Sequence, residues 1–125
     1  MTVTVLTVDD SKIVRKVTRN MLEPLGFEVI EAEDGQVALD LCANTMPNVI
    51  LMDFNMPVMN GMDSLKYIRA LPNGGTDVII IFCTTMNEMD FIQKAIMAGA
   101  NEFVMKPFDA DILKNKFEQL GIEAN

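Results

Sequence analysis

The chain has 125 residues, which fits a single domain over residues 1–125, and half of its residues are hydrophobic, as in a globular protein. Its net charge of −8, from 10 Lys and Arg against 18 Asp and Glu, argues against nucleic acid or an anionic membrane as the main partner, because both bind basic surfaces. Histidine is absent, which excludes Ser-His-Asp catalysis, Cys-His catalysis and His-based zinc sites.

Five short apolar, β-branched runs predict strands, and segments with apolar residues at helical spacing predict a helix after each of them. The strands are expected at 3–8, 27–31, 49–53, 78–84 and 102–105. The helices are expected at about 11–25, 34–44, 61–72, 87–99 and 109–120. Ser11 is the predicted N-cap of the first helix, Gly26 its predicted C-cap, and Pro24 indicates a loosened last turn.

The apolar residues of each predicted helix indicate the face that it turns toward the core. The predicted inward residues are Ile13, Val14, Val17, Met21 and Leu25 in the first helix, Val37, Ala38, Leu41 and Cys42 in the second, Leu65 and Ile68 in the third, Ile92, Ala95 and Ile96 in the fourth, and Ile112, Leu113, Phe117 and Leu120 in the fifth.

The regular alternation of strand and helix predicts an α/β fold, a doubly wound (βα)5 domain with one parallel five-stranded sheet and helices on both faces. The apolar run Val78–Phe82 fits a central strand that is buried on both sides. We therefore expect one compact unit without an internal repeat or linker.

No export signal or membrane span is predicted. The first ten residues lack a basic region before an apolar stretch, and no apolar run reaches the roughly 18 residues that span a bilayer. Cys42 and Cys83 lie in apolar surroundings, which predicts that both are buried and reduced. We expect a cytoplasmic protein.

Polar residues follow four of the predicted strands: Asp9-Asp10-Ser11, Asp53-Phe54-Asn55, Thr84-Thr85 and Lys106-Pro107. In an open parallel sheet, ligands bind outside the carboxyl ends of the strands, so these side chains are expected to converge. Clustered carboxylates repel each other by roughly 1 to 4 kcal/mol per pair at about 4 Å, and a hard cation such as Mg²⁺ would offset this repulsion. A Lys can pair with phosphoryl oxygens, and an Asp can form an aspartyl phosphate.

Four motifs in this order resemble the receiver domain of two-component response regulators, close in size to the single-domain chemotaxis regulators. They are Val8-Asp9-Asp10-Ser11, the run from Asp53 to Gly61 (DFNMPVMNG), Thr84, and Lys106-Pro107-Phe108. The resemblance covers nearly the whole chain and implies a flavodoxin-like strand order, 2-1-3-4-5.

The resemblance also implies roles for the acidic residues. Asp53 would be the phosphoacceptor. Asp10, Asp53 and the backbone carbonyl of Asn55 would bind Mg²⁺, with Asp9 acting on the metal through water. Lys106 would pair with the phosphoryl group.

Two further positions would transmit the signal. The hydroxyl of Thr84 would move to the phosphoryl group, although Thr85 is an alternative carrier of this hydroxyl. Phe103 takes the switch-aromatic position, where the chemotaxis regulators commonly have Tyr. The Lys106–Pro107 peptide would be cis. Met86 departs from the polar residue often found two positions after the switch hydroxyl.

The function implied is that of a monomeric phosphorylation switch and not an enzyme, beyond its own phosphotransfer and slow autodephosphorylation. A histidine kinase would phosphorylate Asp53, and the modified face would bind a target protein, with the flagellar motor switch as the leading expectation. No output domain is expected, because the chain ends just beyond the fifth predicted helix. A phosphatase is a further candidate partner. A phosphate-sink or phosphorelay-shuttle regulator is the alternative.

Two other functions fit less well. A Mg²⁺-dependent phosphatase with an Asp nucleophile needs a second Asp two residues later, and Asn55 stands there. An FMN-binding flavodoxin needs a loop rich in Gly and hydroxyls after the first strand, where Asp9 and Asp10 would repel phosphate.

Overall fold

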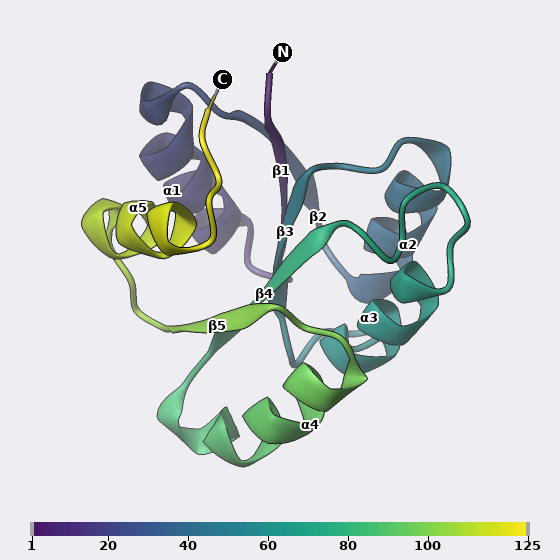
Figure 1. Ribbon diagram of the computed structural model, residues 1–125. Helices are drawn as coiled ribbons and strands as arrows, with labels where there is room; N and C mark the ends of the chain where they lie inside the picture. The colour runs from purple at the N-terminus through teal and green to yellow at the C-terminus, as the bar shows by residue number, and fades with distance from the viewer. Residues whose placement is uncertain (1, 125) are drawn as a thin grey trace.

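The computed structural model describes residues 2–124 (Figure 1). Its five strands are β1 (Thr4–Val8), β2 (Glu28–Ala32), β3 (Val49–Asp53), β4 (Ile79–Thr84) and β5 (Glu102–Met105). They form one sheet in the order β2-β1-β3-β4-β5, and every neighbouring pair is parallel. This confirms the fold class predicted from the alternation and the strand order implied by the resemblance.

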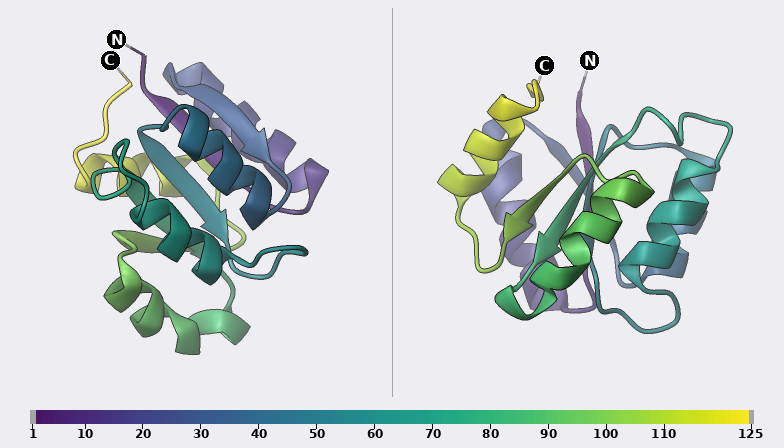
Figure 2. Two further views of the ribbon diagram at one scale, coloured as in Figure 1. Left: turned by 90° about the vertical axis from the view of Figure 1, so that its right-hand side faces the viewer. Right: turned by 60° about the horizontal axis from the view of Figure 1, so that its bottom comes forward.

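Helices cover both faces of this sheet, as the two further views in Figure 2 show. The α-helices are α1 (Lys12–Leu22), α2 (Gly35–Asn44), α3 (Gly61–Arg69), α4 (Ile92–Ala98) and α5 (Ala110–Gln119), and the 3-10 helices are η1 (Glu23–Leu25) and η2 (Met86–Phe91). In Figure 1, α1 and α5 lie on one side of the sheet, and α2, α3 and α4 on the other. The result is a three-layer arrangement with the sheet in the middle.

The sheet separates two hydrophobic cores because successive strand side chains point to opposite faces. Leu6 and Ile50 pack on the side of α2, α3 and α4, whereas Val5 and Val49 pack on the side of α1 and α5. All of β3 is buried, as expected for a central strand of a parallel sheet. The strand that carries Asp53 is thus fixed from both faces.

The helix ends differ in part from the expected ones. Ser11 caps α1, as predicted, and accepts a hydrogen bond from the Val14 amide at 3.2 Å. The α-helix ends earlier than expected, at Leu22, and continues as the 3-10 turn η1 that contains Pro24, because proline disfavours a continued α-helix. Gly26, with φ of 97°, closes η1.

Two other expected helices also begin or end elsewhere. The third α-helix ends at Arg69, ahead of Pro72, since a proline disfavours helical backbone in the residue before it. The fourth segment begins as the 3-10 helix η2 at Met86, and α-helix follows only from Ile92. Strand β2 begins at Glu28, one residue later than predicted.

The predicted inward face of α1 was wrong in part, since Met21 packs against the core but two of the other predicted residues do not. Ile13 is 76% exposed and Val17 is 46% exposed, whereas the buried residues of this helix are Thr18 and Leu22. The buried Thr18 hydroxyl donates to the Val14 carbonyl at 2.9 Å, so the polar group is satisfied inside the helix. Three further residues predicted to be inward are also exposed, namely Leu25, Ile96 and Ile112.

Both cysteines are buried free thiols, as predicted, and burial raises the pKa of each to about 12. Among residues 2–124, no helix combines the length and the apolar character that a bilayer crossing requires.

Candidate functional site

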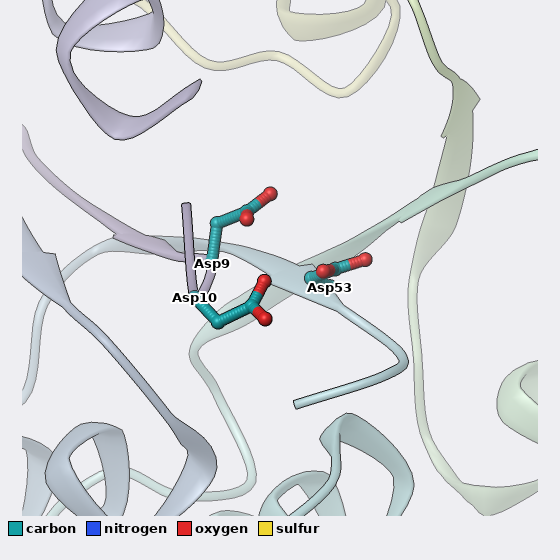
Figure 3. Close-up of side chains that lie close together, drawn as sticks. All are labelled: Asp9, Asp10 and Asp53. Atoms are coloured by element: carbon teal, nitrogen blue, oxygen red, sulfur yellow. The ribbon is translucent and has the colours of Figure 1, made fainter. Parts of the chain in front are cut away.

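Three carboxylates meet at the carboxyl ends of β1 and β3 (Figure 3). Asp9 and Asp10 directly follow β1, and Asp53 is the last residue of β3. One oxygen of each lies within 4.8 Å of the others. Asp9 and Asp53 are buried, and Asp10 is exposed at the mouth of the site. The convergence predicted from the strand ends is therefore present.

The turn after β1 holds Asp9 in place. Its Oδ1 accepts a hydrogen bond from the Ser11 amide at 2.9 Å, and its backbone carbonyl accepts one from the Arg15 guanidinium at 2.6 Å. Since Ser11 also caps α1, the beginning of this helix and the orientation of Asp9 are fixed together.

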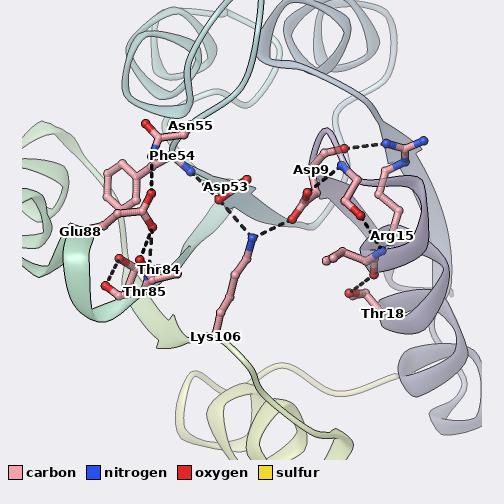
Figure 4. A network of polar contacts seen from close by, with 12 residues as sticks. Asp9, Arg15, Thr18, Asp53, Phe54, Asn55, Thr84, Thr85, Glu88 and Lys106 are labelled. Carbon is pink, nitrogen blue, oxygen red and sulfur yellow. Dashed lines mark hydrogen bonds and ion pairs between the residues drawn. The ribbon is translucent and has the colours of Figure 1, made fainter.

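Lys106 is the cation of the site (Figure 4). Its Nζ lies 2.8 Å from Asp9 Oδ2 and 3.2 Å from Asp53 Oδ1. The Lys106–Pro107 peptide is cis, as expected. One ammonium thus faces three carboxylates, so the site keeps an excess of negative charge.

The loop after β3 folds back past Asp53, which is buried at the end of the strand. Asp53 Oδ1 accepts a hydrogen bond from the Phe54 amide at 3.0 Å, and the Gly61 amide closes the loop on the Phe54 carbonyl at 2.9 Å. A Cβ on Gly61 would overlap the Asp53 carbonyl oxygen and lie 2.9 Å from the ring of Phe82. Glycine is required at this position because the returning loop passes so close to the strand.

Burial raises the pKa of Asp53 to about 6, with a further contribution from the charge of Asp9, while Lys106 acts in the opposite direction. Burial lowers the pKa of Lys106, but the hydrogen bond to Asp9 and the charge of Asp53 outweigh this effect and raise it. Lys106 is therefore charged, whereas ionised Asp53 is held at an energetic cost near neutral pH.

The donor set suits a hard cation. All three side chains offer carboxylate oxygens, the ligands that divalent ions such as Mg²⁺ prefer. Asp10 forms no ion pair with a Lys or Arg anywhere in residues 2–124, so its charge is available to an added cation. A divalent cation here would also offset the energetic cost of keeping Asp53 ionised in a buried position.

Thr84, the last residue of β4, and Thr85, directly after it, are held differently. Thr84 is fully buried, and its hydroxyl donates to the Thr85 carbonyl over a long 3.3 Å. The Thr85 hydroxyl donates instead to the carboxylate of Glu88 at 3.2 Å. Neither hydroxyl is hydrogen-bonded to Asp53 in this structure.

Phe103 lies on the edge strand β5 and is half-buried. Its ring packs against the core on the side of α4, and Lys116 Nζ lies 5.9 Å from the ring centroid. The position predicted for the switch aromatic is thus at the surface where β5 meets its flanking helices.

Sequence reasoning missed one polar residue beside the site. Glu88 is 9% exposed, and its carboxylate binds both Asn55 and Thr85. The available signal was the spacing Thr85-x-x-Glu88, which is the pattern of a helix capping box. No local sequence pattern predicts the contact between Glu88 and Asn55, because the two residues are far apart in the sequence.

Comparison with known proteins matches these features. The profile of the response regulator receiver domain matches residues 5–118. The chemotaxis protein CheY1 of Helicobacter pylori is 42% identical over 115 residues, covering 90% of this chain and 92% of that protein. The chemotaxis protein CheY of Bacillus subtilis is 37% identical over 108 residues, covering 86% and 88% of the two chains.

Solved structures show the same fold. The chemotaxis response regulator CheY4 of Vibrio cholerae superposes with a TM-score of 0.88 at 31% identity, over 96% of this chain and 99% of that one. The receiver domain of a Pseudomonas aeruginosa sensor histidine kinase, solved with a magnesium ion coordinated in its active-site cleft, has a TM-score of 0.85 at 29% identity, over 95% and 97% of the chains. By sequence, fold and the arrangement of its carboxylates, this chain belongs to the response regulator receiver domains and is closely related to the CheY chemotaxis regulators.

Proposed function

We propose that this chain is a phosphorylation switch in which a carboxylate oxygen of Asp53 accepts a phosphoryl group from the phosphohistidine of a histidine kinase. A P–O bond to Asp53 forms, the P–N bond of the donor breaks, and the imidazole leaves and takes up a proton. The observation that carries the proposal is the buried Asp53 carboxylate, held 3.2 Å from Lys106 beside Asp9 and Asp10. The kinship with the CheY proteins supports the histidine kinase as donor.

The reaction depends on Mg²⁺ in this proposal. Asp10, Asp53 and the backbone carbonyl of Asn55 would hold the ion, and Asp9 would contact it through water. When bound, the ion would offset the negative charge on the phosphoryl oxygens. The all-oxygen donor set supports this assignment, as does the magnesium ion in the Pseudomonas aeruginosa receiver domain.

Lys106 would then pair with the phosphoryl group, and the Thr84 hydroxyl would turn from the Thr85 carbonyl toward it. The Thr84 hydroxyl donates to a neutral carbonyl, whereas that of Thr85 donates to the Glu88 carboxylate, so Thr84 is the threonine that is easier to release. Phe103 would respond on β5, and the surface around it would bind the target protein. Because the named relatives are chemotaxis proteins, we propose a chemotaxis role with the flagellar motor switch as target.

An enzymatic reading has less support. A phosphatase with Asp53 as nucleophile would need an acid or base two residues later, and the carboxamide of Asn55 is neither near neutral pH. Its amide donates to Glu88 at 2.6 Å, so the side chain is already engaged.

Intact-mass measurement tests the phosphoacceptor. The protein is incubated with acetyl phosphate and Mg²⁺, and we expect the mass of one phosphoryl group to be added, with no addition in Asp53→Asn. An exposed carboxylate such as Asp63→Asn serves as the matched control and should be phosphorylated like the wild type. An equal mass gain in Asp53→Asn would show that another residue is the acceptor.

Affinity capture tests the target. Protein activated with beryllofluoride is expected to retain a flagellar motor component from its own cell lysate, and the Asp53→Asn protein is not. Retention of the kinase alone would favour the phosphate-sink or shuttle role over motor control.

A further inference from the structure

Glu88 is a buried carboxylate outside the acidic cluster. It lies in η2, is 9% exposed, and forms no ion pair with a Lys or Arg of residues 2–124. Three hydrogen bonds compensate for its burial: one from the Thr85 amide at 3.0 Å, one from the Thr85 hydroxyl at 3.2 Å, and one from the Asn55 side-chain amide at 2.6 Å. When only neutral donors compensate for the burial of a charge, the loss of any one of them destabilises that charge.

The two oxygens of Glu88 reach two different loops (Figure 4). Oε1 binds Thr85, directly after β4, and Oε2 binds Asn55, in the loop after β3. The bonds to Thr85 complete a capping box and hold Glu88 rigidly on η2. The cap requires only Oε1, so the shorter bond to Asn55 is not explained by helix capping.

The side chain of Asn55 has little else to hold it. This side chain is exposed, although the adjacent Phe54 is buried and Met56 packs against the core. Among the hydrogen bonds of the described residues, the one to Glu88 is the bond that Asn55 makes. Packing of Phe54 and Met56 holds the backbone on either side of Asn55, whereas the bond to Glu88 fixes its exposed side chain and ties it to the segment after β4.

We infer that Glu88 is a positioning residue for the cation site: by fixing the side chain of Asn55, it holds the Asn55 carbonyl where the metal needs it. The inference rests on the proposed function, which assigns that carbonyl to Mg²⁺. Residues that orient metal ligands are commonly worth about 10- to 100-fold in metal affinity. The same carboxylate ties the loop after β3 to the backbone next to Thr84.

Calorimetric titration with Mg²⁺ tests the inference in the unphosphorylated protein. Asn55→Ala removes the amide but keeps the backbone carbonyl and every charge, and we expect an affinity about 10-fold weaker than that of the wild type. Glu88→Ala should show a similar loss, and the double variant should be no weaker than Glu88→Ala, since both changes remove the same bond. Asp63→Ala is the matched control, because this exposed carboxylate lines the same groove as Glu88. The Mg²⁺ affinity of this variant should stay within about twofold of the wild-type value.

A second readout needs no metal. The side-chain amide signals of Asn55 in an NMR spectrum, identified by their loss in Asn55→Ala, should shift to the position of a free amide in Glu88→Ala. Glu88→Gln keeps an acceptor for Thr85, and a turned Asn55 amide can accept from the new amide, so this variant should recover most of the Mg²⁺ affinity. The Glu88→Gln variant also keeps the inference testable if Glu88→Ala fails to fold.

Three results would overturn the inference. They are wild-type affinity in Asn55→Ala, equal losses of affinity in Glu88→Ala and Asp63→Ala, and Asn55 signals that do not change in Glu88→Ala. Absence of Mg²⁺ binding in the wild type would instead overturn the proposed function, and the inference with it.

Discussion

Asp53 is subject to two opposing electrostatic effects. Burial and the neighbouring Asp9 disfavour its charge, whereas Lys106 favours it, and the net result is a pKa of about 6 against an ordinary value of 3.8. A carboxyl whose pKa is raised by folding binds protons more tightly in the folded state. Its contribution to stability is therefore greatest below about pH 4 and is lost as the pH rises through about 6.

This pH dependence gives a prediction for the stability of the Asp53→Asn variant. In EDTA at about pH 7.5, the variant should be more stable than the wild type by up to about 3 kcal/mol for a net shift of about two units, which already includes the ion pair with Lys106. At about pH 4.5 the gain should fall to about 1 kcal/mol, because Asp53 is then protonated in the folded wild type and only partly protonated in the unfolded chain. Urea unfolding at both pH values measures this. A gain that is independent of pH would contradict the assigned pKa.

Val58 carries strain in the loop after β3. Its φ is 66°, in the left-handed region that β-branched residues rarely adopt, and the Met59 amide donates to the Pro57 carbonyl across it at 2.7 Å. The side chain is 82% exposed, so little packing offsets the strain.

Val58→Asn should therefore stabilise the protein by about 1 kcal/mol, because Asn tolerates positive φ. Thermal unfolding should show a melting temperature higher by a few degrees. Val17→Asn is the control: Val17 is also exposed but lies in α1 with helical backbone, and this change should give no gain. An unchanged or lower melting temperature for Val58→Asn would show that the strain is not relieved.

At the scale of elements, β5 and its flanking helices are expected to carry the signal. Phe103 is half-buried against the core in the unphosphorylated protein, and Lys116 from α5 lies beside its ring. A Phe gains no hydrogen bond from pointing outward and leaves no polar group unsatisfied when it points inward. We propose that its ring is biased inward before phosphorylation.

Phe103→Tyr tests this bias. The hydroxyl should favour the outward state, so beryllofluoride should cause larger NMR shift changes over α4, β5 and α5 in the variant than in the wild type. Thr84→Ala should reduce the changes in both backgrounds, because the coupling runs through its hydroxyl. A wild-type Phe103 that starts fully outward and swings fully inward on activation would contradict the proposal.

The helices and strands also show where local sequence patterns suffice to predict the structure. The strands were predicted to within one residue at every end, because short apolar, β-branched runs are a direct consequence of burial in a parallel sheet. The rotation of α1 was not predicted. Its sequence has apolar residues on more than one side, and only the packing of Leu22 and Thr18 against the sheet decides which of them is inward.

For the whole molecule, the acidic cluster predicts stabilisation by Mg²⁺. The three carboxylates are held together only in the folded state, so a bound cation stabilises that state by mass action. We expect a higher melting temperature in Mg²⁺ than in EDTA, with a gain of about 3 kcal/mol when the ion is present at 100 times its dissociation constant. Asp10→Ala should lose most of the gain. An undiminished gain in this variant would place the ion elsewhere.

The sequence by itself determined the fold class and the members of the site. Apolar periodicity specified the alternation, and in a parallel sheet all carboxyl ends lie at one edge, so Asp9, Asp10, Asp53 and Lys106 had to meet there. Only the tertiary structure decided the raised pKa of Asp53 and the bond between Asn55 and Glu88, which lie 33 residues apart. The physical reason is that secondary structure follows from neighbouring residues, whereas burial and contacts between loops depend on how distant segments pack.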